Sequence, residues 1–224
     1  MKNFIYSCLV ITAFIPTLNG SEETLSRHFQ LTDRRKRIIE IEKLDDQSAI
    51  AEFAKNDEID GVSLTALDLI DEQTLLADIA KNSIHPEVRR RAIMKIDSPD
   101  TFEFIAKNDS DADVRRWAVY KITNQVIRAG IATNDTNFSV RFEAAYGLED
   151  QTLRAEIAKT DEHPAVRSAI AKTLETEAFL QEIVENDNDE SVRQSAMSRL
   201  DALKTKKQAK EETSESTETE KSKP

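Results

Sequence analysis

The sequence predicts an all-α solenoid built from about seven short two-helix repeats. Two observations lead to this prediction: a valine recurs every 26 residues, and apolar residues recur around it at the spacing of a helix. A fixed period of this length without gaps is typical of supersecondary units that stack on one another. The recurring valines are Val62, Val88, Val114, Val140, Val166 and Val192.

The first helix of each repeat is predicted around this valine. In one repeat Asp111 can cap the helix, and Val114, Ala118 and Ile122 then lie on one face because they are four residues apart. Pro86 and Pro164 occupy the first helical position of two other repeats, where a missing N–H is tolerated. The same buried face should therefore recur in every repeat.

A second, shorter helix should follow after a tight turn. Ile-Ala pairs such as Ile105-Ala106 mark its apolar face, and a polar loop containing aspartate leads to the next repeat. The repeats run from near Lys36 to near Leu203, with a degenerate first unit and a last unit that lacks its second helix, as expected of capping repeats. The residues that can cap the second helix are Asp46, Ser98, Asn124, Asp150 and Thr176.

This frame resembles the HEAT-like, armadillo-like family of helical repeats, with its aspartate loop, Val-Arg pair, Ala and Leu. The runs DSDADVRRWAVYKI and DNDESVRQSAMSRL carry the resemblance, which covers nearly all of residues 33–203. A unit of 26 residues is short for a HEAT repeat and approaches the variant leucine-rich repeats, which leaves open whether the second element is α or 3₁₀. The resemblance implies a right-handed α–α superhelix with the first helices on its concave side. It implies no particular role, because such folds serve unrelated functions.

The two ends of the chain differ from the repeats. Residues 1–20 are typical of a secretory signal peptide, because Lys2 precedes an apolar run over 4–15 and Gly20 ends the segment. A membrane anchor is the alternative, but the run is shorter than the roughly 20 apolar residues of a spanning helix. Residues 21–32 form a lead-in to the repeats. Residues 204–224, rich in Lys, Glu, Ser and Thr, are expected to be disordered because they have too little apolar surface to bury.

Composition excludes several classes of function. Cys8 is the only cysteine, so a processed chain would have no disulfide and no thiolate site. The formal net charge of −11 argues against nucleic acid as a partner. The sequence has no phosphate loop, no nucleophile elbow and no histidine pair at metal-binding spacing. We therefore expect an exported protein, periplasmic or secreted, with no catalytic residues, no metal, no cofactor and no integral membrane segment.

An arginine follows five of the recurring valines, and an aspartate recurs in the loops. Each arginine could pair with the aspartate of its own loop or with the aspartate twenty residues on, in the next repeat. Ser63 and Ser83 replace an arginine and an aspartate that are twenty residues apart, and this joint loss favours the pairing between repeats. The predicted structural ladder is Arg37–Asp57, Arg89–Asp109, Arg115–Asp135, Arg141–Asp161 and Arg167–Asp187.

The best candidate for a binding face lies on the first helices of the central repeats. The positions two, three, six and seven residues after each valine should be exposed, and in these repeats they hold basic and aromatic residues. Such residues contribute most to protein interfaces. The alternative is that some of the rings fill gaps between repeats. The candidate residues are Arg90, Arg91, Arg116, Trp117, Tyr120, Lys121, Phe142 and Tyr146.

Two hypotheses about function follow. The first is an exported, non-enzymatic scaffold that binds a peptide or a protein on its concave face. The second is an enzyme or accessory factor on the same scaffold, similar to the DNA glycosylases and lyases that HEAT-like families include. The expected export, the acidic charge and the missing catalytic cluster favour the scaffold. The sequence identifies neither the partner nor the oligomeric state.

Overall fold

The computed structural model describes residues 34–221, with side chains up to Lys210. This part of the chain folds into thirteen α-helices without a strand. It divides into two compact units, one ending at Ser98 and the other beginning at Pro99. None of the described helices is both long and apolar enough to cross a membrane. The expected signal peptide and lead-in, residues 1–20 and 21–32, lie outside the described residues.

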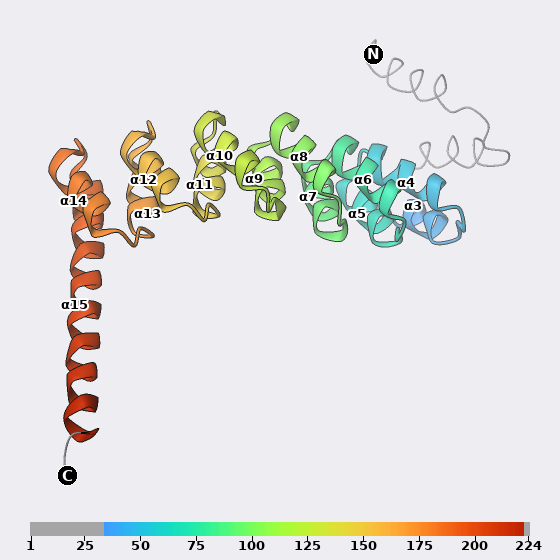
Figure 1. Ribbon diagram of the computed structural model, residues 1–224. Helices are drawn as coiled ribbons and strands as arrows, with labels where there is room; N and C mark the ends of the chain where they lie inside the picture. The colour runs from blue at the N-terminus through green and yellow to red at the C-terminus, as the bar shows by residue number, and fades with distance from the viewer. Residues whose placement is uncertain (1–33, 222–224) are drawn as a thin grey trace. The chain divides into compact units, whose positions relative to one another are not determined.

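The unit that ends at Ser98 contains five of these helices. They alternate between two rows, and each even-numbered helix packs against the odd-numbered helix that follows it (Figure 1). Successive odd-numbered helices also pack on one another, as do α4 and α6. The helices are α3 (Arg34–Ile41), α4 (Gln47–Asn56), α5 (Asp60–Asp68), α6 (Gln73–Asn82) and α7 (Pro86–Lys95).

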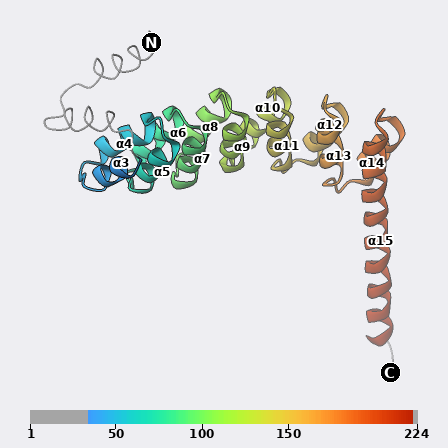
Figure 2. The same ribbon diagram turned by 180° about the vertical axis from the view of Figure 1, so that it is seen from behind.

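The unit that begins at Pro99 repeats this arrangement. The helices pair in sequence order, and the rows of even-numbered and odd-numbered helices can be followed in both views (Figures 1 and 2). The helices are α8 (Pro99–Asn108), α9 (Ala112–Lys121), α10 (Gln125–Asn134), α11 (Phe138–Tyr146), α12 (Gln151–Thr160), α13 (Pro164–Ala171), α14 (Glu177–Asn186) and α15 (Glu190–Lys221).

The predicted apolar columns form the core. All six recurring valines are buried, and so are the small residues four positions on and the Ile or Leu residues eight positions on. The predicted caps also form at several helices: the carboxylate of Asp111 accepts the amides of Asp113 and Val114 at the start of α9. The prediction of an all-α chain whose helices pack against their sequence neighbours is therefore confirmed for the described residues.

The second element of each repeat differs from the short helix that the sequence suggests. The even-numbered helices α4 to α14 are α-helices of ten residues each, at least as long as the first helices α5 to α13. The Ile-Ala pair is buried near the end of α6, α8, α10 and α12, and a further buried residue lies about one turn earlier in several of these helices, such as Leu76 before Ile79. Apolar contacts therefore extend over more than two turns and stabilise a full α-helix.

Glutamines at the start of the even-numbered helices join successive repeats. The amide of Gln47 donates to the carbonyl of Leu69 and accepts the N–H of Asp71. Gln125 makes the same two contacts with Gly147 and Glu149. Each side chain thus binds the turn at the end of the next first helix, where backbone groups lack helical partners.

Helix α15 continues through most of the tail that the sequence predicts to be disordered. Lys204 to Lys210 are all exposed, so this stretch has no buried side chain. Its helical conformation therefore depends on the intrinsic preference of Lys, Glu, Gln and Ala for a helix rather than on packing. Disorder of residues 204–224 stays a prediction.

Candidate functional site

The loops of the second unit contain a ladder of ion pairs between repeats. The guanidinium of Arg115 donates to Asp135 from Nε and Nη2, at 2.8 and 2.9 Å. Arg141 binds Asp161 in the same bidentate way, at 2.8 and 3.0 Å. Arg167 binds Asp187 at 2.7 and 2.9 Å. These three pairs have the twenty-residue spacing that joins each repeat to the next.

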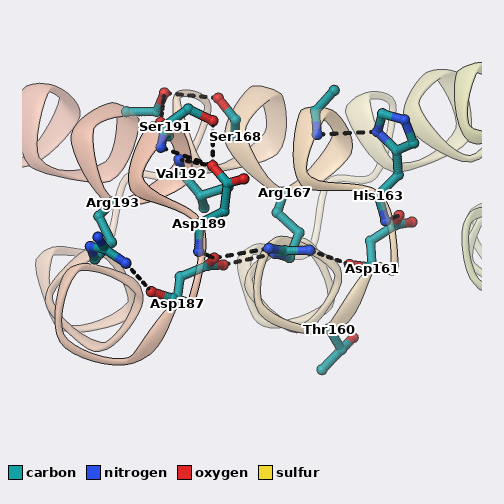
Figure 3. Close-up of polar contacts among 12 residues, drawn as sticks. Thr160, Asp161, His163, Arg167, Ser168, Asp187, Asp189, Ser191, Val192 and Arg193 are labelled. Carbon is teal, nitrogen blue, oxygen red and sulfur yellow. Dashed lines mark hydrogen bonds and ion pairs between the residues drawn. The ribbon is translucent and has the colours of Figure 1, made fainter.

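The third nitrogen of each arginine binds within its own repeat. Nη1 of Arg167 donates to the backbone carbonyl of Asp161 at 2.9 Å, so this side chain lies between two aspartates, as Figure 3 shows. Asp187 in turn accepts the backbone N–H of Asp189. Both spacings that the sequence left open are therefore used: the carboxylate comes from the next loop, and a carbonyl comes from the arginine's own loop.

The ladder shifts the ionisation of its carboxylates. Hydrogen bonds from Arg167 hold the pKa of Asp187 below its ordinary value, against a smaller opposing effect of burial. Burial alone would raise the pKa of Asp135, but hydrogen bonds from Arg115 and from the amide of Asn137 outweigh it and lower the pKa. Both groups are therefore held in their charged form, which suits a structural role.

The first unit shows what happens where the ladder is interrupted. Arg37 binds both oxygens of the buried Asp57 at 2.8 Å. Where the next arginine and aspartate are missing, the hydroxyl of Ser63 donates to the carbonyl of Asp57 and that of Ser83 donates to Ala54. Short hydroxyl contacts thus replace this ion pair. The pair Arg89–Asp109 joins residues of different units and stays a prediction.

The aromatic members of the candidate binding face gather on α9 and α11. Trp117 is half-buried and meets Tyr120 edge to face, with ring centroids 6.0 Å apart. Phe142 and Tyr146 form a second pair at 5.8 Å. Tyr120 and Tyr146 remain 59% and 54% exposed, so folding leaves these rings largely in contact with solvent. We call Arg116, Trp117, Tyr120, Phe142 and Tyr146 the aromatic cluster.

The arginines of the candidate face have acidic partners. Arg116 lies 6.0 Å from the Trp117 ring and forms ion pairs with Asp113 and Glu143, at 3.4 and 4.0 Å. Lys121 ends α9 and is half-buried. In the first unit, Arg90 and Arg91 on α7 both bind Glu87. The arginines are thus locally neutralised, and the face is less basic than its sequence suggests.

Two arginines, one buried and one half-buried, were missed by the sequence reasoning. Arg128 is only 9% exposed and donates to the carbonyls of Tyr120, Ile122 and Glu143, near the ends of α9 and α11. Burial lowers its pKa. One repeat later, Arg154 donates to Tyr146, while its buried Nε has no partner. A signal existed, because these arginines interrupt the apolar column Ile50, Leu76, Phe102, Arg128, Arg154 and Leu180.

The histidines of the repeats have structural contacts. His85 binds the carbonyl of Asp57 at 2.7 Å through Nε2. His163 accepts the amide of Ala165 at the start of α13 and stacks on Phe138 at 4.2 Å. The described residues contain no group of three or more His, Cys, Asp or Glu side chains placed to hold a metal ion. The aromatic cluster is therefore the strongest candidate for a functional surface.

Comparison of the chain with models of protein families, with curated proteins and with solved structures finds no match.

Proposed function

We propose that this protein is an exported, non-enzymatic scaffold that binds a peptide or a protein through the aromatic cluster. The observation that carries the proposal is the exposure of Tyr120 and Tyr146 beside Trp117 and Phe142. A chain needs no large, solvent-exposed rings at these positions in order to fold. Tyrosine and tryptophan are the residues that most often anchor protein interfaces.

Under this proposal the repeats form a right-handed, HEAT-like superhelix of seven units, with the odd-numbered helices on its concave side. The packing in the second unit supports this orientation, because successive odd-numbered helices contact one another more extensively than even-numbered helices do. The row with the closer packing is expected on the inside of a curve. Arg90 and Arg91 of the first unit stay predicted members of the binding face.

The surroundings of the aromatic cluster suit an extended or helical peptide. Small side chains follow it along the same row: Ser168 and Ala169 on α13, then Ser195 on α15, whose hydroxyl lies 2.8 Å from that of Ser168. Low side chains beside large rings leave room for a bound chain next to its anchors. Because Arg116 is already paired, we expect apolar and aromatic contacts to dominate over charge in this interface.

The proposal is tested by capturing partners from the envelope and culture medium of the native organism. Tyr120→Ala should abolish capture while the thermal unfolding curve stays close to that of the wild type, because this side chain is mostly exposed. Leu153→Ala is the matched control, since Leu153 is a similarly exposed apolar residue on α12. Equal loss of capture by both variants would contradict the proposal, as would unaltered capture by Tyr120→Ala.

A further inference from the structure

A second set of ion pairs joins repeats along the even-numbered helices. In the first unit, Lys55 on α4 binds Asp78 on α6 at 2.7 Å. In the second unit, Lys159 on α12 binds Glu182 on α14 at 3.2 Å. Both pairs join residues 23 positions apart, so the sequence can be searched for the same arrangement in every repeat.

Helix α10 lacks this arrangement on both of its sides. Thr133 stands where the neighbouring repeats have Lys107 and Lys159, and Gly130 stands where α12 has Glu156. Every other even-numbered helix of the described chain carries at least one carboxylate, and α10 carries none. Its one charged residue, Arg128, is buried. The solvent-exposed face of α10 is therefore uncharged, on a chain in which 33% of residues are charged.

The first half of that face is apolar and open, and the polar Thr133 and Asn134 follow it. Val126 is 82% exposed, and a Cβ placed on Gly130, one turn later, would have no atom within 4 Å. A glycine within a helix costs about 0.5–1 kcal/mol relative to alanine, and no neighbouring atom requires the glycine here. Neither residue is explained by the packing of the fold. A glycine on an exposed helix face allows another backbone to approach closely.

Grooves lie on both sides of α10. The groove between α8 and α10 has a volume of about 420 Å³, and its lining includes Ala106, Val126, Ile127, Gly130 and Ile131, with Lys107 beside them. Most of this lining is apolar, as expected of a groove that receives the apolar face of a helix. A partner helix in this groove can therefore bury Val126, which is 82% exposed.

The groove between α10 and α12 is acidic. It has a volume of about 600 Å³, and its lining contains the carboxylates of Asp135, Glu156, Asp161 and Glu162 against the single cation of Arg141. Asp135 is paired with Arg115, Asp161 with Arg141, and Glu156 lies 3.7 Å from Lys159, so these four carboxylates exceed their three cations by one. The excess charge lies at Glu162, which is largely exposed beside Arg141. A partner that lies along α10 therefore meets an apolar groove on one side and a negative groove on the other.

We propose that α10 and its two grooves dock an amphipathic helix of a partner protein, with its apolar stripe on Val126 and Gly130 and basic residues bordering the stripe on the α12 side. Charge complementarity selects this occupant, because the negative groove favours Lys or Arg and disfavours Glu or Asp. This surface belongs to the row of even-numbered helices and is separate from the aromatic cluster, so the proposal stands independently of the proposed function.

The test measures binding of the full chain to fluorescent synthetic helices of about five turns. One peptide carries a Leu and Ala stripe bordered by Lys, the second has Glu in place of Lys, and the third has the composition of the first in scrambled order. We expect the Lys peptide to bind at least about tenfold more tightly than either of the others. Equal affinities, or no binding of the Lys peptide, would overturn the proposal.

Variants place the binding on α10. Gly130→Lys adds a bulky cation to the open face and should weaken the Lys peptide at least about tenfold. It should not lower the melting temperature, because Lys is the better helix former and the space is empty. Ala178→Lys is the matched control: it adds the same charge to α14, at the exposed position two repeats after Val126, and should change affinity less than about threefold.

Three results would contradict this assignment. The first is equal weakening by Gly130→Lys and Ala178→Lys, and the second is loss of peptide binding in Tyr120→Ala. The third is a homodimer in light scattering that Gly130→Lys dissociates, because a second copy of the chain would then cover α10. Intact binding by Tyr120→Ala supports the proposal and shows that the two surfaces act separately.

Discussion

Each ion pair of the arginine ladder depends on one arginine side chain that joins two repeats. Arg141 binds the carboxylate of Asp161 with two nitrogens and the carbonyl of Asp135 with a third, and its side chain is only 5% exposed. A buried carboxylate that loses such a partner remains desolvated and unpaired. Arg193 binds the carbonyl of Asp187 in the same way, but its acidic partner is the exposed Glu190 of its own helix.

These two arginines give a matched comparison. Arg141→Gln should lower the free energy of unfolding by about 3 kcal/mol, and Arg193→Gln by about 1 kcal/mol, because only the first leaves a buried carboxylate unpaired. Urea denaturation measures both values. A double-mutant cycle should show coupling between Arg141 and Asp161, and near-additivity between the side chains of Arg141 and Asp135. Equal costs of the two single variants would show that the ladder does not stabilise the fold.

The ladder also predicts the response of stability to acid. The folded pKa of Asp187 is lowered by Arg167, so its contribution is fully present above the unfolded pKa, near 4, and is lost as pH falls through the folded value. The wild type should therefore lose more unfolding free energy between neutral pH and about pH 3 than Arg167→Gln does. Denaturation measured across this pH range checks the difference. A steeper loss in the variant would contradict the assignment.

At the scale of helices, periodicity was informative where residues are buried. The spacing around each valine predicts α5 to α15 and their core, because each buried position admits only small or apolar residues. The spacing underestimates the length of the even-numbered helices. The glutamine contacts were also missed, because Gln47 and Gln125 bind backbone groups, which are the same whatever the residue type. The aromatic cluster follows from the register, whereas the acidic partners of its arginines depend on side-chain conformations that the sequence leaves open.

The buried Arg128 explains a glycine at the end of α11. A Cβ at position 147 would overlap Nη1 of Arg128, whose guanidinium binds the carbonyls of Tyr120 and Ile122. Gly147→Ala should therefore lower stability by about 1–2 kcal/mol, since the displaced guanidinium loses these acceptors in a buried place. Adding Arg128→Leu, which restores the residue type of this column at Leu76 and Leu180, should make the double variant more stable than the sum of the two single effects. Thermal and urea denaturation measure both. Strict additivity would show that the two sites do not interact.

At the scale of the whole molecule, there are two accounts of residues 204–224: the sequence predicts disorder, whereas α15 continues to Lys221. Ending the chain after Leu203 should leave the melting temperature nearly unchanged, because Lys204 to Lys210 are exposed. Circular dichroism of the same protein decides the conformation: a disordered tail contributes little helical signal, whereas a helix that continues to Lys221 contributes a measurable share. A large drop in melting temperature would contradict both accounts, because the tail would then pack on the repeats.

The division into two units could not be predicted from a period that runs without a gap through residues 33–203. The period describes which residues each repeat buries, and it is the same on both sides of Ser98. The proposed export likewise depends on residues 1–20, outside the described residues, and N-terminal sequencing that finds Ser21 first would support it.

The central claim is that the aromatic cluster binds a peptide or a protein, and site-specific photocross-linking in the native organism tests it most directly. A photoreactive phenylalanine analogue would replace Tyr120, Tyr146 or, as a control, the exposed Leu153 on α12. The account predicts the same discrete adduct from positions 120 and 146, none from position 153, and loss of the adduct in a second chain that also carries Trp117→Ala. Adducts of equal yield from all three positions, or none from positions 120 and 146, would contradict it.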